Sequence, residues 1–170
     1  ALLAWVISSF LTEQMFRREA TLSSEFVHNV LVSDGSIEYL KHPTDDMLRA
    51  RFRNSIEHLT NMQDVLRANV YAADRHVLWS TDPDLIGKRF TDNDELDTAI
   101  RGELVVEAGR INDDVRLKKE HVGLSRLAVF FVETYIPVTE GNGKPVIGVV
   151  ELYKAPLALT DAIHEGQMRV

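Results

Sequence analysis

Cysteine is absent from this chain of 170 residues. A chain without thiols forms no disulfide, offers no thiolate to a metal and has no cysteine nucleophile. The glycine-rich loops that hold nucleotide phosphates and the GxSxG turn of many hydrolases are also missing. The six histidines include no HExxH motif and no pair four residues apart, the spacing that places two ligands on one helix face. We therefore expect a chain that is not an enzyme and that holds neither a metal nor a cofactor.

Basic residues are outnumbered in this sequence. The chain has 19 Lys and Arg against 26 Asp and Glu, which gives a formal net charge of -7. Because a surface that binds nucleic acid must neutralise phosphates with basic side chains, we expect no nucleic-acid partner. The overall charge does not argue against a nearby membrane, where local charges matter. With 45% hydrophobic residues, the chain has enough apolar content for the core of one globular domain.

A long uncharged run is missing too, although the chain starts with a short one. The first eleven residues, ALLAWVISSFL, carry no charge. A membrane span needs about 20 apolar residues, and a signal peptide needs a basic start. Two interpretations remain open: the outer end of a transmembrane helix that begins outside this sequence, or a buried first helix.

Apolar residues continue at helical spacing from Leu3 to Val30, and no glycine or proline intervenes before Gly35. The pattern predicts one helix of about thirty residues. Such a helix must pack along its length, and the spacing fits both a seam with a second copy of the chain and a position across its own domain. We expect it to be the helix through which the chain forms a homodimer.

A second helix is predicted after Pro43, with Thr44 as its N-cap and acidic residues in its first turn. Its expected apolar face consists of Met47, Leu48, Phe52, Ile56 and Leu59.

After residue 64 the pattern becomes that of strands. Residues 66–73 and 76–81 are rich in Val, Tyr and Trp, and the short turn between them predicts a β-hairpin. A short helix follows, with Asp92 as its expected cap and Gly102 at its end. The remaining predicted elements are strands at 103–111, 129–138 and 146–154, a charged loop at 111–128 and a final helix at 156–170.

Helices beside an antiparallel sheet predict the α+β class. We divide the chain into a helical region at 1–64, a sheet region at 65–155 and an exit helix at 156–170.

Two segments resemble the Cache domains, PAS-like extracytoplasmic sensors of bacterial membrane receptors. NVYAADRHVLWSTDPDLIGKRF, residues 69–90, is similar to the first hairpin of that family and the loop after it. ETYIPV and VIGVVELYK, residues 133–138 and 146–154, are similar to its last hairpin. The order and spacing of these motifs agree with the family. The turn AADRH departs from it, because the glycine common there is missing.

The resemblance implies a five-stranded antiparallel sheet with the long helix on one face and a ligand pocket on the other. It also implies that the chain is the periplasmic portion of an inner-membrane receptor, flanked by transmembrane helices and most similar to the sensor domains of histidine kinases. The output module, whether a histidine kinase, a diguanylate cyclase or a chemoreceptor module, would lie outside this chain.

Cations for a small carboxylate or amino-acid ligand are expected in and beside the charged loop. A buried anion must be paired, and the guanidinium of arginine binds a carboxylate through two parallel hydrogen bonds. Arg110 and Arg126 are therefore the predicted cationic partners. The alternative interpretation of this loop is a solvated run of mixed charges.

The strands offer the walls of the predicted pocket. Side chains two residues apart share one face of a strand, so Phe131, Glu133 and Tyr135 lie together. Tyr71 and Trp79 of the first hairpin complete the set of candidate ligand-binding residues. Aromatic residues in strands also serve as plain core, which leaves a second function open: a ligand-free dimerisation or protein-interaction module.

Overall fold

The computed structural model describes residues 2–61, 64–110 and 130–155. The strands are β1 (Val65–Ala72), β2 (Val77–Ser80), β3 (Val105–Arg110), β4 (Phe130–Thr139) and β5 (Val146–Lys154). They form a five-stranded sheet in the order β2-β1-β5-β4-β3, and each neighbouring pair is antiparallel. This arrangement confirms the predicted α+β class and PAS-like sheet. The predicted loop at 111–128 and exit helix at 156–170 lie outside the described residues.

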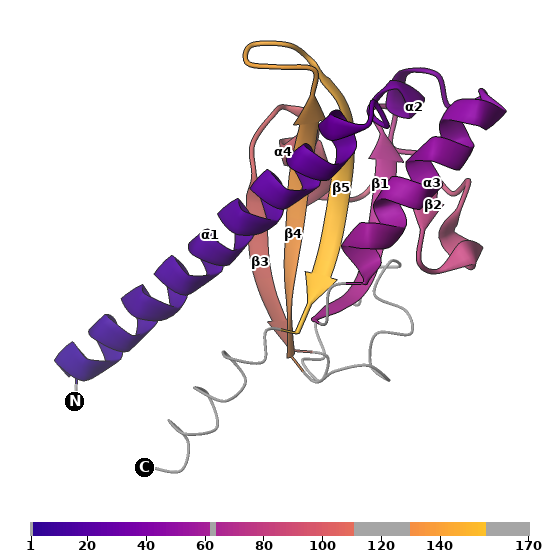
Figure 1. Cartoon of the computed structure of the whole chain (residues 1–170). Helices are drawn as coiled ribbons and strands as arrows, with labels where there is room; N and C mark the ends of the chain where they lie inside the picture. Colours follow the sequence, from indigo (N-terminus) through magenta and orange to yellow (C-terminus); the bar gives the residue numbers. More distant parts are fainter. Residues whose placement is uncertain (1, 62–63, 111–129, 156–170) are drawn as a thin grey trace.

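Helix α1 (Leu2–Ser33) has 32 residues and confirms the predicted long helix. It crosses one face of the sheet, and its N-terminal half continues beyond the sheet edge (Figure 1). In the C-terminal half, which lies over the sheet, Leu31 is fully buried. In the N-terminal half, Leu3 is 73% exposed and Phe10 is 58% exposed. The buried interpretation of the first segment is therefore wrong for these residues. None of the described helices is long and apolar enough to cross a membrane.

Helix α3 (Asp46–Thr60) lies beside α1 on the same face (Figure 1). The Asp45 carboxylate accepts hydrogen bonds from the N–H groups of Met47, at 2.9 Å, and Leu48, at 3.0 Å. The prediction of Thr44 as cap was wrong, because Asp45 is the residue with extended backbone that reaches these donors. Met47 was also wrong as a core residue, since it is 81% exposed. At about 100° per residue it lies on the side of the helix away from the buried residues.

Two short helices complete the layers. Helix α2 (Glu38–Lys41) was not predicted, because four residues are too few to show a helical period. Helix α4 (Asp94–Ile100) covers the sheet face away from α1 (Figure 1). Its cap is Asn93, whose side chain accepts from the Leu96 N–H at 2.8 Å, so the prediction of Asp92 was one residue off.

The turn of the first hairpin contains Arg75 in the left-handed region, at φ 75°. The structure thus places a non-glycine residue where the resemblance leads one to expect glycine. The Arg75 guanidinium bonds Asp97 of α4 at 2.6 Å, a contact that holds the strained turn in place. After β2 the chain forms the single turn η1 (Pro83–Leu85) and returns toward α4.

Because side chains alternate along each strand, the sheet has one apolar core on each of its two faces. On the helix side, Val70, Ile136 and Val150 pack with residues of α1 and α3 such as Leu31 and Phe52. On the opposite side, the apolar cluster consists of Tyr71, Val77, Leu85, Phe90, Leu96, Ala99, Tyr135 and Val149. A smaller cluster on that side pairs Phe131 with Tyr153. Between these two clusters the side chains are polar.

Candidate functional site

A buried polar cluster lies at the centre of the sheet, on the face away from α1. We call it the polar core, and it consists of Asn69, Tyr71, Glu133, Tyr135, Glu151 and Tyr153. Each of these side chains is at most 1% exposed. They come in pairs two residues apart from β1, β4 and β5, the three strands in the middle of the sheet. Because alternate residues of a strand share a face, all six side chains lie close together on the same face of the sheet.

The register of the strands brings the two carboxyl groups together. Glu151 is the cross-strand partner of Asn69 on one side and of Tyr135 on the other. Glu133 is the partner of Tyr153. Because cross-strand and diagonal neighbours lie within side-chain reach, the glutamates on adjacent strands meet the tyrosines of both.

Glu151 is held by three neutral hydrogen-bond partners. Asn69 Nδ2 lies 2.7 Å and the Tyr71 hydroxyl 2.6 Å from Glu151 Oε2. The Tyr153 hydroxyl lies 2.5 Å from Glu151 Oε1. All of these contacts are buried, so the carboxyl group has hydrogen-bond partners but no exposure to bulk solvent that would stabilise a charge.

Glu133 is joined to the same cluster through tyrosines. The Tyr135 hydroxyl donates to Glu133 Oε1 at 2.5 Å, and the Tyr153 hydroxyl lies 3.0 Å from the same oxygen. Asn93, the cap of α4, donates to the Tyr135 hydroxyl at 3.0 Å. The cap of α4 is thus connected to the centre of the sheet.

Burial and mutual charge change the acidity of these groups. Burial, followed by the charge of Glu133, raises the pKa of Glu151 to about 8, although the bonds from Tyr153 and Tyr71 act in the other direction. Burial, together with the charges of Glu151 and Glu133, also raises the pKa values of Tyr135 and Tyr153. Tyr135 and Tyr153 therefore stay neutral at physiological pH.

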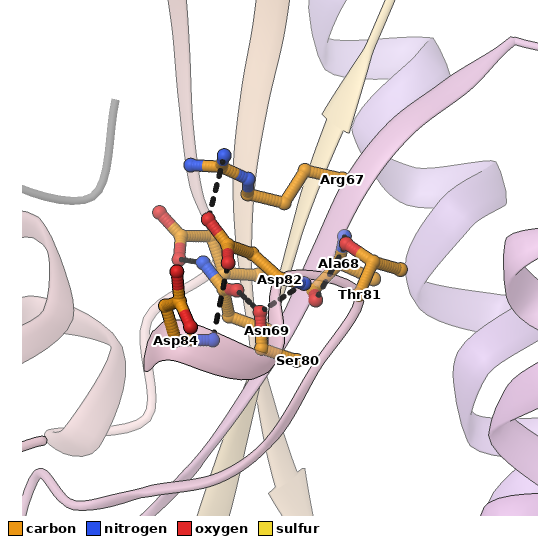
Figure 2. A network of polar contacts seen from close by, with 8 residues as sticks. Arg67, Ala68, Asn69, Ser80, Thr81, Asp82 and Asp84 are labelled. Atoms are coloured by element: carbon orange, nitrogen blue, oxygen red, sulfur yellow. Dashed lines mark hydrogen bonds and ion pairs between the residues drawn. The ribbon is translucent and has the colours of Figure 1, made fainter. Parts of the chain in front are cut away.

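The polar contacts continue from the polar core toward the edge strand (Figure 2). Ser80 of β2 donates to Asn69 Oδ1 at 2.6 Å and accepts from the Asp82 N–H at 2.9 Å. Asp82 in turn pairs with the buried Arg67 at 3.2 Å. This network fixes the orientation of the Asn69 amide, whose oxygen accepts from Ser80 while its nitrogen donates to Glu151.

On the opposite face, the end of β5 is tied to the long helix. Lys154 is 4% exposed, and its ammonium bonds the carboxylate of Glu19 and lies 3.4 Å from the Ser23 hydroxyl, both on α1. A second carboxylate, that of Asp64, lies 3.3 Å from the same nitrogen. We call these four residues the Lys154 joint. Strand β5 thus presents Glu151 to the polar core and Lys154 to α1.

A groove of about 390 Å³ also lies on the helix side, between α1 and the end of β4. Its walls include Glu25 and His28 of α1 and Pro137 and Thr139 of β4. The groove does not reach the polar core. Among the described residues no group of three or more His, Asp and Glu is arranged to hold a metal ion.

Most of the predicted site residues that the structure describes lie together. Tyr71, Glu133 and Tyr135 belong to the polar core, and Phe131 packs beside it against Tyr153 with ring centroids 5.6 Å apart. Trp79 lies elsewhere, against the helix-side core. The reason is register: Trp79 is opposite Val70, whose side chain faces the helices.

The two predicted arginines remain untested. The backbone of Arg110 ends β3 and pairs with Phe130, while its side chain and the whole of Arg126 lie outside the part of the chain that the structure describes. The prediction overlooked Asn69, Ser80 and Asn93. A signal for Asn69 is present in the sequence, since Arg67, Asn69 and Tyr71 alternate along one strand face.

Comparison with solved structures identifies the fold. The chain is similar to the crystal structure of the sensor domain of the histidine kinase DctB from Vibrio cholerae, with a TM-score of 0.58 and 12% sequence identity. The match covers 92% of this chain and 57% of the other, so the chain spans little more than half the length of that domain. The chain shares the fold of this sensor domain. The PAS-like sensor fold implied by the resemblance is therefore confirmed.

Two more distant structures were found. A sensory box sensor histidine kinase from Vibrio cholerae has a TM-score of 0.38 and 10% identity, over 62% of this chain and 92% of the other. An extracellular ligand binding receptor from Desulfohalobium retbaense has a TM-score of 0.43 and 12% identity, over 84% of this chain and 25% of the other. No family model and no curated protein matches the chain.

Proposed function

We propose that this chain is the ligand-sensing domain of a bacterial transmembrane receptor, most similar to the sensor histidine kinases, and that it lies on the periplasmic side of the inner membrane. The observation that carries the proposal is the polar core. Two carboxyl groups and three tyrosines buried at the centre of a sheet are costly, and apolar residues of the same volume would stabilise the fold as well or better. The fold shared with the DctB sensor domain supports the same function.

The polar core favours a ligand with an ammonium group, such as an amino acid, over a simple carboxylate. The Glu133 carboxylate repels an anion strongly where bulk water is excluded, whereas an ammonium group donates charge-assisted hydrogen bonds to it. In our proposal Phe131, Tyr71 and Tyr135 form the apolar wall. Arg110 and Arg126 are the proposed partners of the ligand carboxylate.

Ligand binding would act by shifting the equilibrium between two conformations of the domain. The polar core is buried in this structure, so we place ligand contact in a locally opened state. A ligand that binds the opened state more tightly than the closed state increases the population of the opened state. The size of the increase depends on the ratio of the two affinities.

Strand β5 is the proposed route of the signal. Its residues alternate between the two faces, so a displacement that moves Glu151 also moves Lys154, three residues further along. The Lys154 joint then transmits the displacement to α1. The exit helix proposed at 156–170 follows the same strand and would carry it to the flanking transmembrane helix.

A second copy of the chain is the proposed partner of α1. The exposed apolar side chains of this helix include Leu11, Met15, Leu22 and Phe26, which recur at spacings of four and seven residues. Helices with such a stripe bury it against one another. This surface also favours the second candidate function, a dimerisation module without a ligand.

Thermal unfolding of the 170-residue chain against panels of amino acids, amines and carboxylates tests the sensing proposal. A ligand at 100 times its Kd stabilises the folded state by about 2.7 kcal/mol, which raises the Tm of a domain of this size by roughly 5–10 °C. We expect amino acids to give the shift. We also expect Glu133→Gln to abolish it, whereas the matched change Glu57→Gln on the exposed side of α3 leaves it intact.

Either of two results would contradict this assignment. The first is a shift that survives in Glu133→Gln, which would place the ligand away from the polar core. The second is the absence of a shift from every panel combined with concentration-dependent dimerisation, which would favour the ligand-free module.

A further inference from the structure

The hydrogen bonds around Glu151 require one proton beyond those of the neighbouring tyrosines. Its Oε2 accepts from both Asn69 and Tyr71, so that oxygen is an acceptor only. Its Oε1 lies 2.5 Å from the Tyr153 hydroxyl. The same hydroxyl lies 3.0 Å from Glu133 Oε1. A hydroxyl carries a single proton and cannot donate to both carboxyl groups.

One proton beyond that of Tyr153 fills both of these contacts. With a proton on Glu151 Oε1, this oxygen donates to the Tyr153 hydroxyl, and Tyr153 donates onward to Glu133 Oε1. A proton on Glu133 Oε1 would fill the same contacts in the opposite direction, whereas with neither carboxyl group protonated one of the two contacts joins oxygens with no hydrogen between them. Such a contact is repulsive, and burial leaves no water to relieve it.

We propose that Glu151 is a protonated carboxylic acid in the folded domain, and that loss of its proton at alkaline pH weakens the contact between β4 and β5, so that the sensor sheet responds to pH. The proposal concerns the polar core itself and does not depend on a ligand.

The surroundings of Glu151 support the protonated form. The side chains of Asn69, Tyr71 and Tyr153 that contact Glu151 are neutral, and its carboxyl group also lies within hydrogen-bond reach of the carboxyl group of Glu133. The Arg67 guanidinium, on the same face of β1, pairs with Asp82. Among the described residues, the titratable and charged groups on this face of the sheet include Arg67 and Tyr71 from β1, Glu107 from β3, Glu133 and Tyr135 from β4, Tyr153 from β5, and Asp82 through Arg67.

The sign of the pH effect follows from the two states. In the unfolded chain Glu151 ionises near its ordinary value of 4.5, and in the folded chain burial and the charge of Glu133 raise its pKa to about 8. Between these values the folded state binds one more proton than the unfolded state. The folding equilibrium constant therefore falls about tenfold for each unit of rising pH in that window, and this contribution is flat on either side.

Carbon-13 NMR of the chain labelled in its glutamate side chains tests the proposal directly. Through-bond correlation from the backbone assigns the carboxyl carbon of Glu151 without a variant. We expect this carbon to keep the shift of a protonated acid at pH 6 and to titrate near pH 8. Titration of this carbon between pH 4 and 5 would overturn the proposal.

Glu151→Gln supplies a second test, because an amide mimics the protonated acid. Its oxygen accepts from Asn69 and Tyr71, and its NH₂ group donates to Tyr153. Denaturation at pH 5, 6, 7 and 8 should show that the tenfold loss per pH unit disappears in Glu151→Gln and persists in Glu57→Gln. An unchanged slope in Glu151→Gln would refute the proposal. If this variant does not fold, the NMR titration of the unmodified chain still decides.

Discussion

Replacing Lys154 with methionine is expected to destabilise the domain by about 2 kcal/mol. Removing one partner of a buried ion pair costs about 3–5 kcal/mol when the other charge is left without water. Here the Lys154 side chain is 4% exposed, but those of Glu19 and Asp64 are 30% and 25% exposed. Both carboxylates regain part of their hydration, and methionine replaces most of the lysine stem, so the expected cost lies below that range.

Urea denaturation at pH 7 measures this cost, with Lys144→Met in the exposed β4–β5 turn as the matched control. Hydrogen exchange supplies the second measurement. Because Lys154 ties β5 to α1, we expect faster exchange along residues 19–31 of α1 in Lys154→Met and unchanged exchange in β3. A loss within about 0.5 kcal/mol of the control, the range usual for surface substitutions, would refute the joint as a connection between sheet and helix.

Three further changes test the cores and a cap. Phe52→Ala should cost about 3–5 kcal/mol in denaturation experiments, since Phe52 is fully buried and its ring lies 5.0 Å from that of Tyr39; a cost under 1 kcal/mol would contradict the helix-side core. Tyr135→Phe removes the hydroxyl between Glu133 and Asn93 and should cost about 1–3 kcal/mol, with a neutral result counting against the network. Asp45→Ala should cost about 1 kcal/mol through loss of the α3 cap, whereas Thr44→Ala should have no effect.

Periodicity made the elements of this fold predictable. The long helix, the hairpins and the faces of β4 and β5 follow from spacings of three to four and of two residues, and the structure has them where these spacings place them. The helix caps were harder to predict from the sequence. Thr44 and Asp45 are both good capping residues, and only the backbone conformation decides between them. For the same reason Asn93, and not Asp92, is the cap of α4.

The candidate site was only partly predictable, because it depends on pairing between strands far apart in the sequence. The face shared by Phe131, Glu133 and Tyr135 follows from local alternation. The contact of Asn69 with Glu151, 82 residues later, requires the strand order, which no local pattern contains. Strand pairing also explains why the prediction for Trp79 failed. Its aromatic side chain suggested a pocket wall, but Trp79 pairs with Val70 and therefore faces the helices.

Amide chemical-shift mapping of the labelled chain during titration with the amino-acid and carboxylate panels tests the sensing account most directly. The account predicts that a binding amino acid shifts the amides of Glu133, Tyr135 and Glu151 and, through the Lys154 joint, those of Glu19 and Ser23 in α1. Shifts confined to the groove between α1 and the end of β4, or shifts in the polar core that never reach α1, would contradict it.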